Sequence, residues 1–236
     1  MKTTLLVPVL NEIEGLKLIM PLIDRAWVDQ ILILDGQSTD GSAQWARGQG
    51  YEVYVQKKPG LKNGYLEVWG RIRGDIVITF SPDGNSIPEL IPSLVVQMWS
   101  GYDMVIVSRY KGGAKSHDDD VVTAFGNWMF TRLVNLLFRG GYTDAMVMFR
   151  AYRKDLIYEL DLDKSQIYFV EMLFRTKISW EPILSVLCAK NNLRIAEIPG
   201  DEPPRVGGVR KLQVIRWGLA YLTQILCVYF RRKNDA

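Results

Sequence analysis

The chain has only two cysteines, little excess charge and no long uncharged apolar run. Both cysteines, Cys188 and Cys227, stand between apolar residues, which is typical of buried thiols in a reducing compartment and excludes a disulfide framework. The longest apolar stretch, Trp217 to Phe230, is shorter than the roughly 18 residues that a membrane span needs. The first apolar run is broken at Pro8 and is too short for a secretory signal. We therefore expect a protein that faces the cytosol and does not cross a membrane.

Two common nucleotide-binding motifs are also missing. The sequence has no G-x-G-x-x-G after its first apolar run and no G-x-x-x-x-G-K-[ST] segment, so a dinucleotide-dependent dehydrogenase and a P-loop enzyme have no support. The net charge of +3 is too small to indicate nucleic acid as a partner. With 48% hydrophobic and 23% charged residues over 236 positions, the composition indicates a self-sufficient globular core.

Apolar runs alternate with helical patterns along the first half of the chain. Strands are predicted at residues 3–10, 28–34, 51–56, 75–80 and 104–107, and helices at 16–23, 43–48, 61–72 and 88–99. This alternation is typical of βαβ units and predicts an α/β protein with a doubly wound, mostly parallel sheet and helices on both faces. Because each strand ends in polar residues and parallel strands share a direction, these residues should gather in one crevice, suited to a nucleotide with a metal at its phosphates.

The segment from Thr79 to Ser86 follows one of the predicted buried strands. Within it, Asp83 and Asn85 stand two residues apart and offer oxygen ligands of the hard kind that Mg²⁺ or Mn²⁺ prefers. The same composition is common in ordinary turns. From these residues alone, a metal site and a structural turn both remain open.

Six segments resemble, in order, the motifs of family 2 glycosyltransferases. They are residues 8–12, 35–42, 81–85, 108–110, 144–150 and 205–212. They are most similar to the branch that includes dolichyl-phosphate mannose synthase and other polyprenyl-phosphate sugar transferases. The resemblance implies a GT-A fold with a Rossmann-like sheet. It also implies transfer of a hexose, with inversion, from a nucleotide-sugar to a lipid-linked or saccharide acceptor, as in the synthesis of cell envelope polysaccharides.

The resemblance assigns several residues to the nucleotide-sugar donor. Pro8, Glu12 and Asp35 fall in motifs that hold the nucleoside, Asp35 being the first Asp of a D-D-G-S-x-D-G-T pattern. Arg205 and Lys211 match the R-x-x-G-x-S-K segment that closes over the donor phosphates. Because prolines and glycines flank these two cations, we expect a moving loop in which both are disordered or exposed when no donor is bound.

The metal also follows from the resemblance. Asp83 falls on the second Asp of the D-x-D motif that grips a Mg²⁺ or Mn²⁺ ion on the diphosphate, and Asn85 falls on a residue that shares this work. Ser81 stands in place of the first Asp of that motif, and Gly36 in place of the second Asp of D-D-G-S. With one carboxylate fewer the metal is held less tightly, although Mg²⁺ sites commonly use one or two carboxylates together with substrate phosphate.

The acceptor side has fewer matching residues. Asp144 is the first candidate for the general base that a hydroxyl acceptor would need, and Glu181 is the second, whereas a phosphate acceptor would need none. Asp119 and Thr123 stand where the branch carries an Arg and a Ser that contact the acceptor phosphate, and Asp119 argues against an anionic acceptor. Arg109 is favoured as a substrate contact over a plain salt bridge at a strand end.

The segment before residue 121 carries one His and three Asp at 117–120. It could be a metal site, but acids at a helix N-terminus are favoured, because residues 121–138 follow with a helical pattern. That helix is more apolar than one core face requires. Core packing is the default interpretation, and a membrane-facing patch is the alternative.

The resemblance divides the chain into a glycosyltransferase domain at 1–211 and a C-terminal amphipathic helix with a basic tail at 212–236. Apolar residues recur at helical spacing from Leu212 to Phe230, and Arg231 to Lys233 follow. This pattern predicts a peripheral anchor on the cytoplasmic face of a membrane. The alternative is a helix packed on the sheet or against a second subunit.

Two other classes of function stay open. A non-catalytic nucleotide-sugar binding protein would explain why Ser81 and Gly36 replace carboxylates. A sugar-phosphate nucleotidyltransferase shares the nucleotide-binding fold, but no glycine-rich loop with Arg and Lys follows the first predicted strand. If the transferase interpretation holds, a divalent ion with Arg205 and Lys211 would stabilise the charge that develops on the leaving diphosphate.

Overall fold

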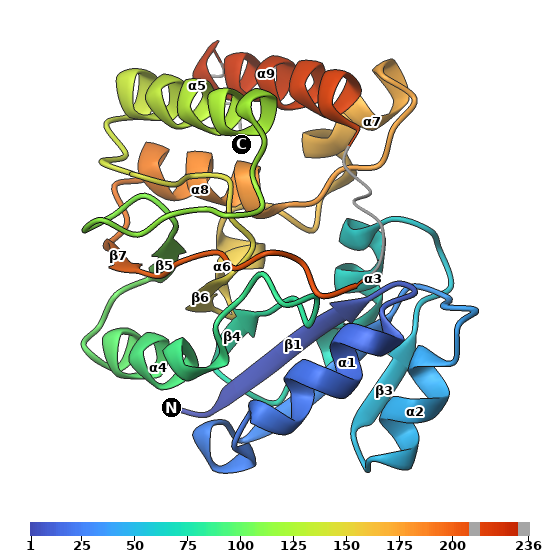
Figure 1. The fold of residues 1–236 in the computed structure, drawn as a ribbon. Helices are drawn as coiled ribbons and strands as arrows, with labels where there is room; N and C mark the ends of the chain where they lie inside the picture. Colours follow the sequence, from blue (N-terminus) through green and yellow to red (C-terminus); the bar gives the residue numbers. More distant parts are fainter. Residues whose placement is uncertain (208–212, 231–236) are drawn as a thin grey trace.

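The computed structural model describes residues 1–207 and 213–230, and a seven-stranded sheet forms its centre (Figure 1). The strands are β1 (Thr3–Val9), β2 (Gln30–Asp35), β3 (Glu52–Val55), β4 (Ile76–Thr79), β5 (Met104–Ser108), β6 (Arg150–Arg153) and β7 (Ile195–Pro199). Their order across the sheet is β3-β2-β1-β4-β6-β5-β7. The order reverses on either side of β1, as in doubly wound folds, and the predicted α/β class is confirmed.

One strand runs against the others. β6 pairs antiparallel with β4 and with β5, and Ala151 lies opposite both Ile78 and Val105, while every other pair in the described sheet is parallel. The sheet is therefore mostly parallel, as predicted. No strand was predicted at β6, which lies between β4 and β5.

Helices cover both faces of the sheet. They are α1 (Ile13–Ile19), α2 (Ser42–Gly48), α3 (Leu61–Val68), α4 (Ile91–Trp99), α5 (Val121–Phe138), α6 (Leu156–Glu159), α7 (Phe169–Leu173), α8 (Glu181–Lys190) and α9 (Val214–Phe230). Short 3₁₀ turns lie at Met20–Leu22, Arg25–Trp27, Trp69–Arg71, Pro88–Leu90 and Ser165–Tyr168. One apolar cluster joins the sheet to α1, α2 and α4, and a second joins it to α3, α5, α8 and α9.

Alternation along the strands explains these two clusters. In β1, Leu5 and Val7 belong to the cluster under α1 and α4, whereas Leu6 between them belongs to the cluster under α8. Successive strand side chains point to opposite faces, and both faces are covered here, so the strands are apolar throughout rather than alternating with polar residues.

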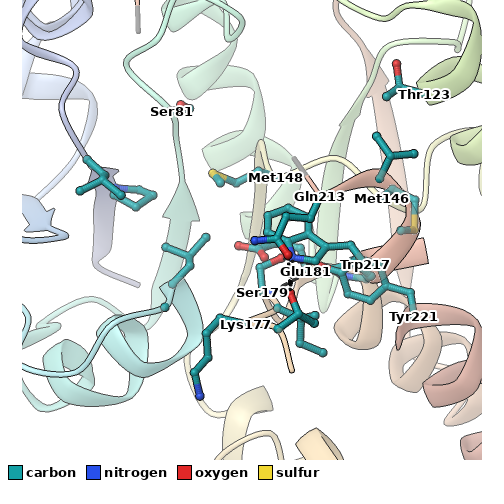
Figure 2. Close-up of a pocket in the computed structure, with 18 of the residues that line it drawn as sticks. Ser81, Thr123, Met146, Met148, Lys177, Ser179, Glu181, Gln213, Trp217 and Tyr221 are labelled. Atoms are coloured by element: carbon teal, nitrogen blue, oxygen red, sulfur yellow. Dashed lines mark hydrogen bonds between the residues drawn. The ribbon is translucent and has the colours of Figure 1, made fainter. Parts of the chain in front are cut away.

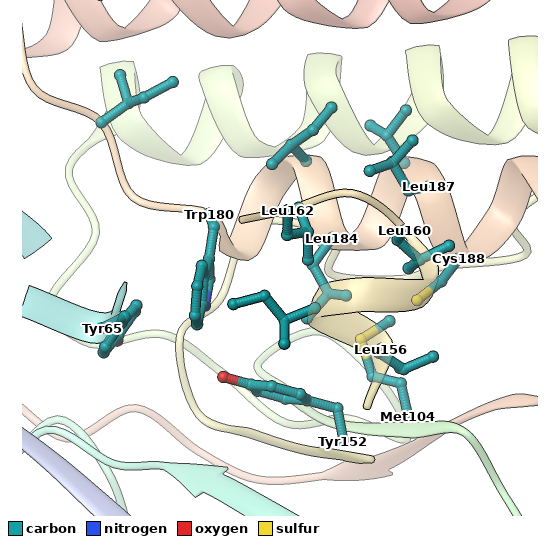
Figure 3. Packing of buried hydrophobic residues seen from close by; sticks show 14 of the residues in the cluster. Tyr65, Met104, Tyr152, Leu156, Leu160, Leu162, Trp180, Leu184, Leu187 and Cys188 are labelled. Carbon is teal, nitrogen blue, oxygen red and sulfur yellow. The ribbon is translucent and has the colours of Figure 1, made fainter. Parts of the chain in front are cut away.

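Helix α8 is buried on all sides. It lies between the sheet and an outer layer in which α5 and α9 pack side by side (Figure 1). Figure 3 shows Leu184 of this helix near Trp180, and Leu187 and Cys188 further along the same helix. A helix that is apolar all round is typical of such a position. Each buried leucine contributes roughly 1.5–3 kcal/mol, so this layer is a main source of stability.

Helix α5 has the predicted bounds and the predicted cap. The side chain of Asp120 accepts a hydrogen bond from the backbone N–H of Thr123 at 2.8 Å, which confirms the N-cap interpretation for this residue. Among the described residues, α5 is the one helix that has the length and the apolar composition to cross a membrane, and 28% of it is buried. Phe130 and Val134 face the core, whereas Phe125 and Leu136 are exposed.

Helix α9 packs on α5, α7 and α8. Ala220, Tyr221 and Ile225 are buried in this contact, while Ile215 and Phe230 are exposed. The boundary predicted at residue 212 and the basic residues 231–233 lie outside the described residues. The division of the chain into two parts stays a prediction.

Candidate functional site

A cavity of about 900 Å³ begins at the carboxyl ends of β1, β2 and β4 and extends to the layer of α5 and α9. Its polar end is lined by residues that include Pro8, Glu12, Ser81, Asp83, Asn85, Arg109 and Arg205. Its other end is lined by residues that include Val122, Phe130, Met146, Trp217 and Tyr221. Figure 2 shows Ser81 on one side of the cavity and Met146, Trp217 and Tyr221 on the other. The crevice predicted from the strand ends is thus continuous with an apolar chamber.

The predicted nucleoside residues differ in their placement. Pro8 and Glu12 line the cavity, but Asp35 does not. Asp35 is 1% exposed, and one of its carboxylate oxygens accepts the backbone N–H groups of Gln37 and Ser38 at 3.0 and 3.1 Å. In this structure Asp35 shapes the loop after β2. Gly36 in that loop lines the cavity.

The loop of Asp83 is held by the segment that carries Arg205. The backbone N–H of Val206 donates to the Asp83 carbonyl at 2.8 Å. Gly84 adopts a φ of +92°, and a Cβ there would stand 2.4 Å from a methyl group of Val206. Asn85 N–H donates to the Asp83 carboxylate at 3.1 Å. Only a glycine fits this turn, so the two segments are docked as a unit.

Arg205 is not exposed as expected. Its guanidinium lies 2.9 Å from the Asp83 carboxylate and 3.8 Å from that of Glu12, and its side chain is 22% exposed. The expectation was wrong because the carboxylates of Asp83 and Glu12 lie within reach and attract this cation. Lys211, the other predicted phosphate contact, lies outside the described residues.

The polar end of the cavity offers donor atoms of the kind that bind a divalent cation. The side-chain oxygen of Asn85 is buried and has no hydrogen-bond partner within residues 1–207 and 213–230, while its amide N–H donates to Asp118 at 3.0 Å. Asp83 adds a carboxylate beside it. Within the same ranges no group of three or more His, Cys, Asp or Glu side chains could enclose a metal. An ion held here would rely on phosphate or water for its remaining ligands, as Mg²⁺ commonly does.

Arg109 is the centre of a buried charge cluster. It makes a bidentate contact with Asp144, from Nε at 2.6 Å and from Nη2 at 3.1 Å. Its Nη1 lies 3.1 Å from Glu202 and 3.4 Å from Asp119. Burial alone would lower the pKa of Arg109, but the carboxylates of Asp144, Glu202 and Asp119 outweigh it and raise the pKa well above its ordinary value. The arginine is therefore a permanent cation that neutralises part of a carboxylate-rich wall.

The arrangement speaks against Asp144 as a general base. Asp144 is fully buried, does not line the cavity, and has both carboxylate oxygens engaged by Arg109. Asp119 does line the cavity, and Tyr110 Oη donates to it at 2.5 Å. Burial and this hydrogen bond raise the pKa of Tyr110 above its ordinary value. The charge of Asp119 is thus balanced by neighbours.

Glu181, the second candidate base, does line the cavity. It begins α8, is 1% exposed, and accepts a hydrogen bond from Tyr65 Oη at 2.7 Å. Its other carboxylate oxygen has no partner within the described ranges. Burial, and then the charge of Glu181, raise the pKa of Tyr65 well above its ordinary value, so the phenol remains the donor of this bond.

Several cavity residues were not predicted as parts of the site. They are Asp118, Glu202, Arg175 and Lys177. Glu202 reaches the site because residues 115–117 pair with it. Glu202 N–H donates to the Lys115 carbonyl at 2.9 Å, and His117 N–H donates to the Glu202 carbonyl at 2.8 Å. No local pattern in the sequence signals this pairing, because the two segments lie far apart along the chain.

The fold and this cavity define a glycosyltransferase of the GT-A type. The family profile described as glycosyl transferase family 2 matches residues 4–161, and the chain belongs to this family. The resemblance inferred from the six motifs is thereby confirmed.

Relatives with assigned names are similar over most of the chain. Undecaprenyl-phosphate mannosyltransferase of Micrococcus luteus is 29% identical, over 93% of this chain and 95% of its own. Polyprenol monophosphomannose synthase of Mycolicibacterium smegmatis is 27% identical, over 92% and 87%. Dolichol-phosphate mannosyltransferase of Pyrococcus furiosus is 25% identical, over 90% and 60%. These names match the branch that the motifs resemble.

Solved structures that are similar to this chain share its fold. Glucosyl-3-phosphoglycerate synthase from Mycobacterium tuberculosis, in complex with Mn²⁺, UDP and phosphoglyceric acid, aligns with a TM-score of 0.65. The alignment covers 99% of this chain and 80% of that chain, at 20% identity. The match supports the GT-A assignment.

Proposed function

We propose that this protein transfers a hexose, with inversion, from a nucleotide-sugar to a polyprenyl phosphate at a membrane surface. The observation that carries the proposal is the single cavity that joins Glu12, Asp83 and Arg205 to a chamber lined by Trp217 and other apolar residues. A nucleotide-sugar fits the polar end, and an acceptor with an apolar tail fits the other. The names of the relatives support the same pair of substrates.

At the donor end, Asp83 and Asn85 would hold a Mg²⁺ or Mn²⁺ ion. The bound ion would stabilise the negative charge that develops on the leaving diphosphate. The Mn²⁺ and UDP of the similar solved structure support a divalent ion of this kind. Arg205 would exchange its contact with Asp83 for the donor phosphates, because a guanidinium binds phosphate through the same paired N–H groups that it offers a carboxylate.

At the acceptor end, a phosphate needs no general base because it is already ionised near neutral pH, with a second pKa of about 6. The buried Asp144 then has a positioning role, since it fixes Arg109, which in turn holds Asp119. Arg175 and Lys177 supply exposed positive charge on the cavity wall formed by the segment between α7 and α8. An anionic acceptor would be attracted to this wall, although Lys177 also lies 3.7 Å from Glu171.

The membrane contact is proposed from exposed apolar side chains on the outer layer. Leu136 of α5, Met172 of α7 and Ile215 of α9 are 80%, 83% and 77% exposed. Large exposed apolar patches mark membrane or protein contacts, and these helices also line or flank the acceptor end of the cavity. If this outer layer of helices lies on the membrane surface, the cavity could reach an acceptor whose lipid chain stays in the bilayer.

Vesicle flotation tests the membrane contact. The protein should float with vesicles that contain anionic lipid, and Ile215→Glu together with Leu136→Glu should reduce the floating fraction, because each carboxylate opposes insertion. Leu22→Glu is the matched control, since Leu22 is 54% exposed on the 3₁₀ turn after α1. Equal flotation of all variants, or none of the native protein, would show that this layer does not bind lipid.

A transfer assay tests the activity. The protein is incubated with UDP- and GDP-hexoses and undecaprenyl phosphate in detergent, with Mg²⁺, Mn²⁺ or a chelator. Asp83→Asn should lower turnover by roughly 10²-fold or more, because it removes the carboxylate that serves the diphosphate. Asp103→Asn is the control, since Asp103 also pairs with an arginine, Arg153, at 2.7 Å but lies outside the cavity.

The outcomes separate the alternatives. Native turnover by Asp83→Asn in the presence of a chelator would refute the metal role. Donor binding without transfer to any acceptor would instead identify a nucleotide-sugar binding protein, and pyrophosphate release from a nucleoside triphosphate would identify a nucleotidyltransferase.

A further inference from the structure

Two helix-interior glycines line the apolar end of the cavity. Gly126 belongs to α5 and Gly218 to α9, and both are half-buried. A glycine inside a helix costs about 1 kcal/mol relative to alanine. Such a cost is usually offset where a neighbouring backbone approaches too closely for a side chain. The surroundings of these two residues show whether that reason applies.

No such approach exists at either position. A Cβ at Gly126 would meet no atom within 4 Å, and a Cβ at Gly218 would meet only the ring edge of Phe130, at 4.0 Å. The backbone conformation gives no reason either, because neither residue has a positive φ. What the two glycines preserve is therefore the open space between α5 and α9.

This space forms a seam that we call the α5–α9 seam. It is lined by Val122, Gly126 and Phe130 of α5 and by Val214, Trp217, Gly218 and Tyr221 of α9. Val122 and Val214 are 61% and 43% exposed, so the seam opens at the surface of the outer layer. At its inner end it is continuous with the cavity that holds Asp83 and Arg205.

A polar group lies beside the seam where it meets the rest of the cavity. Asn127 follows Gly126, lines the same cavity and is 7% exposed, and its amide oxygen has no partner within residues 1–207 and 213–230. A buried amide without a partner costs stability unless a ligand or water satisfies it. Because the free atom is an oxygen that accepts a hydrogen bond, it suits a group that donates one, such as a hydroxyl or a water, rather than an ionised phosphate.

We propose that the α5–α9 seam binds isoprene units of the acceptor beyond the first two, and that Gly126 and Gly218 keep it wide enough for the branched chain. This proposal rests on the proposed function and adds the binding site of the lipid chain to it. The chain would enter from the exposed side of the outer layer, and its phosphate would lie in the cavity toward Arg175 and Lys177. A leucine at either glycine would project into the seam, where a Cβ has open space.

Acceptors of two lengths test the proposal. Transfer is measured with undecaprenyl phosphate and with geranyl phosphate, which has the same head and a much shorter chain. Gly218→Leu and Gly126→Leu should raise the KM for undecaprenyl phosphate by about tenfold, the effect of losing contacts with roughly two methylene groups. The KM for geranyl phosphate, the donor KM and the slow hydrolysis of the donor should change less than threefold.

Two further variants control for packing. Gly70→Leu places the same side chain at a glycine that also has no atom within 4 Å but lies outside the cavity, and it should change neither KM. Gly218→Ala should not impair folding, since alanine favours the helix, and it should shift the KM for undecaprenyl phosphate in the same direction as leucine.

The possible results are distinct. If the native protein transfers to neither acceptor, the proposed function fails. If it transfers to both, but the seam variants lose both equally or lose neither, the function stands and the seam proposal is wrong. Selective loss of the long acceptor supports the seam.

Discussion

Replacing Arg109 by methionine should destabilise the fold strongly, because this residue is the cation of a cluster with three carboxylates. Asp144, Glu202 and Asp119 lie 2.6, 3.1 and 3.4 Å from its guanidinium, and its side chain is 12% exposed. Removing one partner from a buried ion pair costs about 3–5 kcal/mol, because the remaining charge is left in a poor environment. We expect a loss of about 4 kcal/mol in the free energy of unfolding at pH 8.

The loss should depend on pH in a defined direction. Without the cation, burial holds the pKa of Glu202 further above its unfolded value of about 4. In the native protein burial already raises the pKa of Glu202, against the opposing effect of Arg109. A carboxyl group whose pKa is higher in the folded than in the unfolded protein stabilises the fold fully at a pH below its unfolded pKa. This stabilisation is lost as the pH rises through the pKa of the folded state. The deficit of Arg109→Met should therefore shrink between pH 8 and pH 5.

Urea unfolding, followed by circular dichroism and tryptophan fluorescence at both pH values, measures the effect. Arg153→Met is the matched control, because Arg153 also contacts two carboxylates, Asp103 and Glu159, each at 2.7 Å. Its side chain is 34% exposed, so solvent screening should limit its loss to about 1 kcal/mol. Equal losses for the two variants, or a deficit for Arg109→Met that is the same at both pH values, would refute the reasoning.

Two other predictions concern packing and thiol chemistry. A methyl group at Gly15 would stand 2.3 Å from the Pro82 carbonyl oxygen, so Gly15→Ala should lose about 1–3 kcal/mol in thermal melts, while Gly48→Ala, with no atom within 4 Å, should lose nothing. Equal melting temperatures would contradict this close contact. Burial raises the pKa of Cys188 to about 12, whereas Cys227 is exposed, so a disulfide reagent at pH 8 should titrate one thiol in the folded protein and two in denaturant. Rapid reaction of both thiols in the folded state would show that α8 is not buried.

Local patterns were sufficient for most of the fold but not for its centre. The parallel strands are apolar runs, and α5 begins at a capping aspartate. The spacing of apolar residues and the capping residue therefore identify these elements. β6 begins and ends with an arginine. Arg150 is fully buried because its guanidinium donates to the carbonyls of Ala145, Val147 and Glu181. A sequence pattern predicts that an arginine is exposed, because most arginines are. It does not show these acceptors, which come from two other segments of the chain.

The same limit applies to the candidate site. Glu12, Asp83, Asn85 and Arg205 were predicted from motifs, and the structure brings them to one end of the cavity. The partners of Arg109 were not predicted together, because they come from three separate segments. The state of Arg205 was also mispredicted, since its contact with Asp83 depends on distance in space rather than on the composition of its loop.

The position of β6 has a consequence for synthesis on the ribosome. β4 and β5 are made early, but they are not neighbours, and residues 150–153 must leave the exit tunnel before the sheet can extend from one to the other. Until then the nascent chain can pair β1 to β4, while β5 has no described partner strand, because β7 is made later still. An unpaired apolar strand is prone to aggregate. Nascent chains halted before residue 150 should therefore expose β5 to chaperones and proteases, and chains halted well after it should not.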